Sequence, residues 1–260
     1  MSEYLDKFLA YQQAMVEKLI NIPNVVGLMF AGSSADVSRA DQFSDQDFFL
    51  VVEDGFGESF RQDLSWLPNH EQIAFAPRET AHGLKVVYEN GDLLEFAVFE
   101  DDDLNQPWLA VGTDFRVVLE NRNITQRLQA ASKRSLPKPF DRGAEYQLFL
   151  GLILIGVGRY RRGEVIAADQ HIKGYALAHA LRLIRNAVPV QQSRHDTLNP
   201  FRRFELDYPE LGIEIGGLLS ESGERAARGL VEIVNRSISA TNTELSESLV
   251  VAERLGWAAS

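Results

Sequence analysis

The sequence contains no cysteine, and that absence excludes three kinds of chemistry. A chain without thiols cannot form a disulfide scaffold, a thiolate metal site or a cysteine nucleophile. Basic residues are also scarce, since 26 Lys and Arg stand against 37 Asp and Glu and the net charge is −11 at pH 7. Phosphate contacts need clustered Lys and Arg, so this balance argues against a general nucleic-acid-binding protein.

Long hydrophobic runs are missing as well. The longest apolar stretch, residues 148–157, holds two glycines and spans about ten residues, whereas a membrane-spanning helix needs roughly twenty. The first residues, Met1–Asp6, show no basic region followed by an apolar one, so we expect no secretory signal. With 45% hydrophobic and 24% charged residues, the composition predicts a globular, cytoplasmic protein without a membrane segment.

The first half of the chain predicts a helix followed by a small mixed sheet. Apolar residues at helical spacing indicate a helix over residues 3–19, and Asn90-Gly91 is a strong hairpin signal between two apolar runs. A polar loop, Ala31–Ser44, separates the first two strands. The expected strands are residues 25–30, 47–52, 84–89, 93–99 and 115–119.

The second half predicts helices only. Pro137 and Pro139 interrupt regular structure and indicate a linker. The expected helices beyond it are residues 141–162, 165–187, 211–219, 224–238 and 244–255. We therefore predict an α/β (α+β) domain with a small mixed sheet over residues 1–136, followed by an all-helical bundle domain over residues 137–260. The turn-like segment Asn199–Glu205 indicates no function.

The chemistry-bearing pattern lies around the second strand. The first strand ends in Gly32-Ser33, and the second begins at Ser44-Asp45-Gln46-Asp47. Residues two apart in an extended chain share a face, so Asp45 and Asp47 are expected to project together. Two convergent carboxylates repel unless a cation lies between them, and Mg²⁺ prefers such oxygen ligands. A glycine lets backbone approach a phosphate closely, and the serine adds a hydroxyl.

A third acid, Glu95, stands alone in the otherwise apolar run 93–99. If that strand lies beside the Asp45–Asp47 strand, Glu95 reaches the metal or an attacking hydroxyl. Otherwise Glu95 is an edge-strand acid that faces solvent, and Glu89 would be the fallback. Glu89, however, directly precedes Asn90-Gly91 and fits the end of the hairpin.

This ordered set, over about residues 25–99, resembles the DNA polymerase β-type nucleotidyltransferase superfamily. Within it the likeness is to lincosamide nucleotidyltransferases and, more loosely, to aminoglycoside ones. The resemblance implies transfer of a nucleoside monophosphate from ATP or another NTP to a hydroxyl of a small molecule, with Mg²⁺ and release of pyrophosphate. It also implies the residue roles, which are triphosphate binding by Gly32, Ser33 and Ser44, metal binding by Asp45 and Asp47, and metal binding or base catalysis by Glu95.

Two positions depart from the pattern of these families. Gln46 stands where an aliphatic residue is usual, and Asp36 stands where some aminoglycoside enzymes carry a phosphate-contacting Arg. Arg39 could take over that contact from a shifted position in the loop. In related enzymes a basic residue of the helical domain reaches the triphosphate across the interdomain cleft, and Lys173 is our candidate for it.

Two other functions stay open from the sequence. The fold could serve a catalytically weak or inactive binding protein, such as an antitoxin-type partner, or the acceptor could be a protein side chain. The expected partners are a nucleotide and a small-molecule acceptor, without nucleic acid or membrane, and the oligomeric state is left open.

Overall fold

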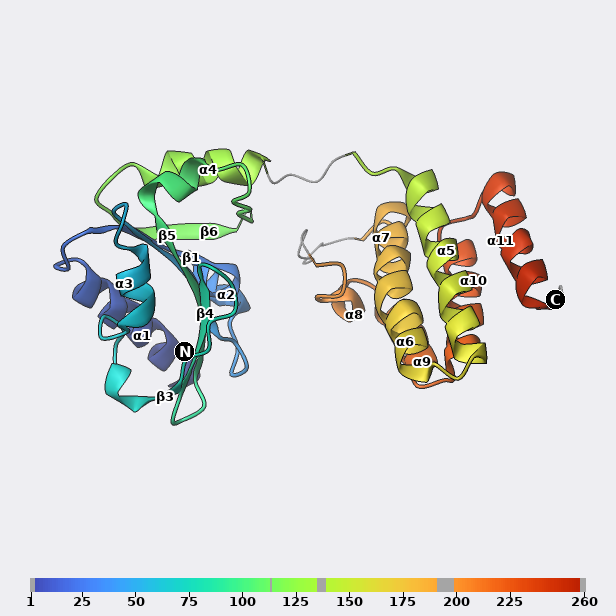
Figure 1. Ribbon diagram of the computed structural model, residues 1–260, viewed down its shortest axis with the longest axis horizontal. Coiled ribbons are helices and arrows are strands. Elements are labelled where there is room, and N and C mark those ends of the chain that lie inside the picture. The colour runs from blue at the N-terminus through green and yellow to red at the C-terminus, as the bar shows by residue number, and fades with distance from the viewer. Residues whose placement is uncertain (1–2, 113, 135–138, 191–198, 258–260) are drawn as a thin grey trace. The chain divides into compact units, whose positions relative to one another are not determined.

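The computed structural model describes residues 3–112, 114–134, 139–190 and 199–257. Two compact units make up the chain, Met1–Leu136 and Pro137–Ser260 (Figure 1). Most of the expected proline linker, residues 135–138, lies outside the described residues. Each unit has hydrophobic cores of its own, so each is described by itself.

The first unit is built on a six-stranded sheet with the order β3-β4-β5-β2-β1-β6. Only β2 and β5 run parallel, and every other neighbouring pair is antiparallel. This sheet confirms the predicted mixed fold class. The strands are β1 (Val25–Ala31), β2 (Gln46–Val52), β3 (Ile73–Phe75), β4 (Gly83–Tyr88), β5 (Leu93–Glu100) and β6 (Phe115–Glu120).

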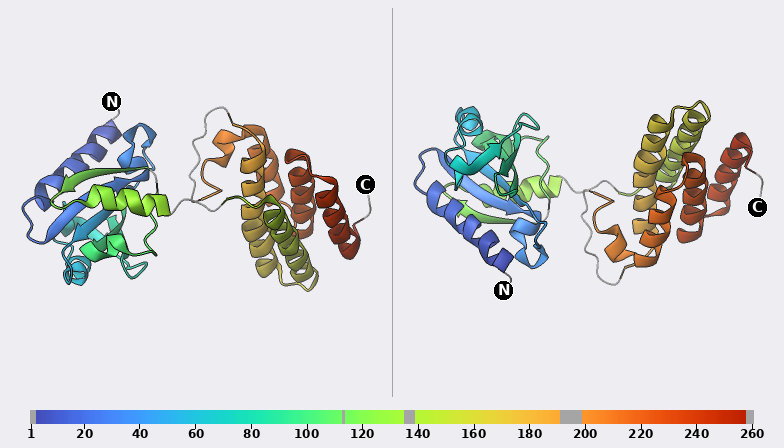
Figure 2. Two further views of the ribbon diagram at one scale, coloured as in Figure 1. Left: turned by 90° about the horizontal axis from the view of Figure 1, so that it is seen from above. Right: turned by 90° about the horizontal axis from the view of Figure 1, so that it is seen from below.

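Helices cover both faces of this sheet (Figures 1 and 2). Helix α1 (Glu3–Leu19) buries Met15 against the face that carries Phe30. Helix α4 (Ile124–Arg134) packs against the face that carries Met29. Met29 and Phe30 are adjacent in β1 and therefore point to opposite faces. The short helix α3 (Gly57–Gln62), α4 and β3 are elements that the sequence patterns did not predict.

The expected polar loop between β1 and β2 contains structure, which corrects that expectation. It holds the short helix α2 (Gly32–Ala35) and a 3₁₀ turn, Val37–Arg39. The Asp36 side chain accepts a hydrogen bond from the backbone N–H of Ser38 at 3.1 Å, the local bond through which Asp commonly starts a turn. The loop is thereby folded tightly beside the start of β2.

The second unit is a helical bundle, as predicted. Its central helix α5 (Arg142–Arg161) contacts α7, α10 and α11, and Figure 2 shows these helices side by side. The expected helix 165–187 is continuous but contains one π-helical stretch, and α8 was not predicted. The remaining helices are α6 (Val165–Asp169), the π-helical Gln170–Ala176, α7 (Leu177–Ala187), α8 (Phe204–Asp207), α9 (Pro209–Leu219), α10 (Gly223–Ser237) and α11 (Asn242–Leu255).

The segment at residues 199–205 has a structural explanation. The Arg185 guanidinium donates to the carbonyls of Pro200 and Arg202 at 3.1 and 2.9 Å and to the Asp207 carboxylate at 2.6 Å. One side chain of α7 therefore fastens this segment to the bundle.

Within the described ranges, no helix combines the length and the apolar character that crossing a membrane requires.

Candidate active site

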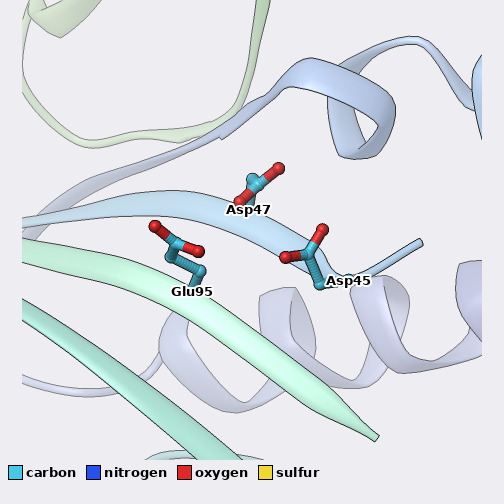
Figure 3. A group of neighbouring side chains, drawn as sticks. All are labelled: Asp45, Asp47 and Glu95. Atoms are coloured by element: carbon cyan, nitrogen blue, oxygen red, sulfur yellow. The ribbon is translucent and has the colours of Figure 1, made fainter. Parts of the chain in front are cut away.

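Three carboxylates converge at the end of the first unit's sheet where β2 begins. Asp47 and Glu95 are direct partners across the parallel pair β2 and β5, and Asp45 lies two residues before Asp47. One ligand oxygen from each residue lies within 4.8 Å of the others. Figure 3 shows the three side chains on the same side of these two strands. The pairing of Asp47 with Glu95 thus brings together residues that lie 48 positions apart in the sequence.

The opposite face of the two strands explains why the acids point this way. Phe48 and Phe96, the next partners along, stack at 4.7 Å with their rings nearly parallel in the core beneath α1. Side chains alternate along a strand, so burying these two rings turns Asp47 and Glu95 to the other face. If either strand shifted by one residue, its phenylalanine would turn out of this core. The packing of the two rings therefore fixes the direction in which Asp47 and Glu95 point.

The donor set fits a hard divalent cation. All three groups are carboxylates, they are half-buried, and their oxygens are close enough to share one ion. Mg²⁺ usually takes only one or two carboxylates and fills its remaining positions with water and phosphate oxygens. Asp45 and Asp47 alone would satisfy that need, which leaves the role of Glu95 to be settled by its surroundings.

Ser34, which the sequence patterns did not single out, holds the two aspartates in place. Its buried hydroxyl accepts a hydrogen bond from the Asp47 backbone N–H at 2.9 Å. The same hydroxyl lies 3.3 Å from the Asp45 carbonyl, to which it can donate. The loop after β1 is therefore tied directly to the backbone that carries both acids.

Gln46, the departure from the family pattern, is buried and hydrogen-bonded through both its amide oxygen and its amide nitrogen. Its amide oxygen accepts from Gln12 at 3.0 Å and its amide nitrogen donates to the Phe8 carbonyl at 3.0 Å. Gln12 of α1 in turn accepts from Arg116 at 2.7 Å. A buried amide costs stability only if it lacks partners, so Gln46 is compatible with the site above it.

The expected phosphate-binding residues flank the acids. Gly32 has φ +55°, and a Cβ there would lie 3.2 Å from the Asp47 carboxylate, so this close approach favours glycine. Ser33 follows it and is half-buried. Ser44 immediately precedes Asp45, and its hydroxyl accepts from the Asp41 N–H at 3.0 Å.

The two basic candidates are placed differently. Arg39 lies in the loop between β1 and β2 and pairs with Asp114 at 2.8 Å, while the Asp114 carbonyl accepts from the Gly32 N–H at 3.3 Å. Arg39 is thus linked to the glycine of the loop. Lys173 lies in the helical unit, where it pairs with Asp169 one turn earlier at 3.1 Å.

A lysine that sequence reasoning missed touches the acid cluster. Lys85 of β4 is the direct partner of Glu95 on the strand side opposite Asp47, and its Nζ lies 3.0 Å from Glu95 and 2.9 Å from Glu79. Hydrogen bonds to these two carboxylates raise the pKa of Lys85, so it carries its charge throughout the neutral range. Counting outward from Asn90-Gly91 as a two-residue turn would place Val86 opposite Glu95. The turn instead has three residues between Tyr88 and Asp92, and this shift brings Lys85 opposite Glu95.

No protein-family model and no curated protein matches this sequence. Among solved structures, the chain is similar to an aminoglycoside 6-adenyltransferase from Bacillus subtilis, at 12% identity and a TM-score of 0.38, with 98% of each chain covered. It is also similar to a nucleotidyltransferase-like protein from Exiguobacterium sibiricum (16% identity, TM-score 0.36, 93% of this chain and 79% of that one). A third similar structure is the CD-NTase CdnG of Bradyrhizobium diazoefficiens in complex with GTP, at 15% identity and a TM-score of 0.33, with 98% of this chain and 93% of that one covered. These TM-scores are below 0.5, so inferences about this chain rest on its own residues.

Proposed function

We propose that this protein is a metal-dependent nucleotidyltransferase that moves a nucleoside monophosphate from ATP or another NTP to a hydroxyl group of a small molecule. The observation that carries the proposal is the convergence of Asp45, Asp47 and Glu95 beside a loop that begins with Gly32-Ser33. Three carboxylates this close together form a donor set that suits a divalent cation, and a glycine with positive φ lets the backbone approach a phosphate closely.

Each residue has a distinct task in this reaction. Gly32, Ser33 and Ser44 would bind the triphosphate, and Asp45 with Asp47 would hold Mg²⁺. The ion, when bound, would offset negative charge on the phosphate oxygens. The acceptor oxygen bonds to the α-phosphorus as the bond from that phosphorus to the β-phosphate oxygen breaks, and pyrophosphate leaves. The hydroxyl proton passes to the Glu95 carboxylate, either directly or through water.

The in-line geometry of this transfer indicates where the acceptor lies. Attacking and leaving oxygens lie on opposite sides of the phosphorus, so an acceptor should enter opposite the loop that holds pyrophosphate. We propose that the acceptor enters on the Glu95 side, where the next residue pair on the acid-bearing face, Phe49 and Ala97, is only partly buried against the neighbouring core.

An aromatic shelf continues that face. It consists of Phe49, His82, Phe99 and Trp108. Trp108 is 51% exposed and stacks on the His82 ring at 5.1 Å. An exposed, pre-stacked indole favours an acceptor with a ring, either a sugar or an aromatic group. Lincosamides and aminoglycosides, which the resemblance of the sequence implies and which carry such rings, are the acceptors to try first, and antibiotic modification is the biological role we propose.

We propose that two basic residues, Lys173 and Arg39, bind the triphosphate. Both side chains already form ion pairs with aspartates, Asp169 and Asp114 respectively, and each would exchange that partner for phosphate.

The test is transfer of label from NTPs labelled at the α-phosphorus, in the presence of Mg²⁺, to a panel of lincosamides and aminoglycosides. We expect label in one class of acceptor, release of pyrophosphate, and loss of both with Asp47→Asn. Label on protein rather than on the small molecule would point to nucleotidylation of a protein acceptor. If neither acceptor nor protein takes up label, and the nucleotide shows no metal-dependent binding, the chain is a binding partner and not an enzyme.

A further inference from the structure

Glu95 lies between two neighbours of opposite charge. On the β2 side its direct partner is Asp47, and on the β4 side its direct partner is Lys85. Lys85 contacts one Glu95 oxygen, Oε2, at 3.0 Å. A carboxylate has two oxygens, so Glu95 can keep this contact while its other oxygen faces the site. Whether Glu95 acts as a metal ligand or as a base therefore depends on Lys85.

Lys85 is itself fixed. Glu79, in the segment that leads into β4, binds the same ammonium at 2.9 Å, and its backbone N–H donates to the Gly83 carbonyl at 2.9 Å. The ammonium is therefore held between two carboxylates. A Lys in the middle of a strand and opposite an acid is a cross-strand pair of the kind that fixes side-chain orientation.

We propose that Lys85 is a positioning residue that holds Glu95 near the metal but prevents it from becoming a metal ligand. This inference rests on the proposed function and deepens it by naming the residue that keeps Glu95 available to the acceptor. A fixed positive charge 3.0 Å from Glu95 lowers the attraction between that carboxylate and a divalent cation. Asp45 and Asp47 then bind the ion, and the Glu95 oxygen that does not contact Lys85 is left to accept the proton of the acceptor hydroxyl.

Mn²⁺ affinity measured by electron paramagnetic resonance, with a non-hydrolysable ATP analogue present, tests this without requiring turnover. Lys85→Met should tighten Mn²⁺ binding by about fivefold, the upper range for a half-exposed ion pair. That gain should vanish in Lys85→Met/Glu95→Gln, because it acts through Glu95. Glu95→Gln alone should change Mn²⁺ affinity little, and Lys85→Arg should restore the wild-type value. Lys7→Met, which removes the same charge from an exposed pair with Glu3, is the matched control.

Turnover supplies the second readout. Lys85→Met should lower kcat by roughly tenfold or more through misplacement of Glu95, with the KM for ATP unchanged, and Lys85→Arg should recover most of it. Equal Mn²⁺ affinity and equal kcat in wild type and Lys85→Met would overturn the role of Lys85 and leave the proposed function intact. A strong loss of Mn²⁺ binding in Glu95→Gln would also overturn it, since Glu95 would then be a ligand. Absence of Mn²⁺ binding in every protein, wild type included, would overturn both proposals.

Discussion

The three-acid cluster of the first unit and the arginine-paired acids of the helical unit are placed in opposite ways, although other acids of the first unit, such as Asp101, also pair with arginines. In the helical unit, acids are matched with arginines: Glu244 lies 2.8 Å from Arg142, Asp207 lies 2.6 Å from Arg185, and Glu145 pairs with Arg182. In the first unit, Asp45, Asp47 and Glu95 face one another. An acid with an arginine partner stabilises the fold by its pairing, whereas acids that face one another destabilise it until a cation arrives.

This difference distinguishes acids that stabilise the fold, which we call structural, from acids that serve the proposed reaction, which we call functional. The distinction needs no comparison with other proteins. Glu244 illustrates the structural kind, because it also accepts from the backbone N–H of Thr241 and closes a capping box at the start of α11. Glu95 illustrates the functional kind. Its contact with Lys85 lies on the side away from Asp47, so no basic residue separates Glu95 from the other two acids of the cluster. Removing an acid of the first kind should cost stability, and removing one of the second should cost activity.

The largest effect is expected for Asp47→Asn. Nucleotidyl transfer should fall by about a thousandfold or more, because the cation loses a ligand at the reacting phosphate. The free energy of unfolding should stay equal or rise by up to about 1 kcal/mol without metal, because a repulsive charge has gone. Steady-state rates and urea unfolding in EDTA measure the two quantities. A rate close to that of wild type would show that the acids do not form the active site.

Glu244→Gln should give the converse result. It leaves Arg142 without its carboxylate at a position where the Glu244 side chain is only 8% exposed, so we expect a loss of about 1–3 kcal/mol in the stability of the helical unit. The kcat at 25 °C should be unchanged wherever the protein is folded. Urea titration followed by circular dichroism gives the stability, and a variant that lost activity while remaining stable would contradict this division of roles.

The pH dependence of stability sharpens the same contrast. The hydrogen bond from Arg142 lowers the pKa of Glu244 from 4.5 to about 2. A lowered pKa in the folded state means that the pair contributes fully above pH 4.5 and loses its contribution as the pH falls toward 2. The stability difference between wild type and Glu244→Gln should therefore shrink between pH 5 and about pH 2.5. A stability difference that stayed constant over that range would show that Glu244 stabilises the protein by something other than its ion pair with Arg142.

The smallest effect is expected on the acceptor side. Trp108→Ala should raise the KM for the acceptor by about three- to tenfold and leave the KM for ATP unchanged, since an aromatic contact of this kind is worth roughly 1 kcal/mol. Trp108→Phe should retain most of the affinity. Phe75→Ala, another exposed aromatic on the outer strand β3, is the control and should have no effect. Equal acceptor KM values in the two alanine variants would show that the aromatic shelf does not bind the acceptor.

Much of the site could be predicted from the sequence because it depends on short-range periodicity. Asp45 and Asp47 are two residues apart, and Glu95 stands out because every other residue from Leu93 to Phe99 is apolar. The sheet class followed from Asn90-Gly91 and from the apolar runs around it. These signals need only the alternation of a strand and the chemistry of a turn.

The residues that were missed depend on pairings between distant segments. Ser34 was one hydroxyl among several in a polar loop, and only the folded loop shows it bonded to Asp47. Gln12 and Gln46 satisfy each other across 34 residues, so neither carries a local signal. Helix α4 has few strongly apolar residues, and its burial comes from the sheet face it covers.

The most direct test of the central claim is calorimetric titration of a non-hydrolysable ATP analogue into the protein with and without Mg²⁺. The account predicts a binding heat that requires Mg²⁺ in wild type and in Glu244→Gln, and no such heat in Asp45→Asn/Asp47→Asn. The same heat in the presence and absence of Mg²⁺, or an undiminished heat in Asp45→Asn/Asp47→Asn, would contradict the claim that these acids hold a cation for the nucleotide.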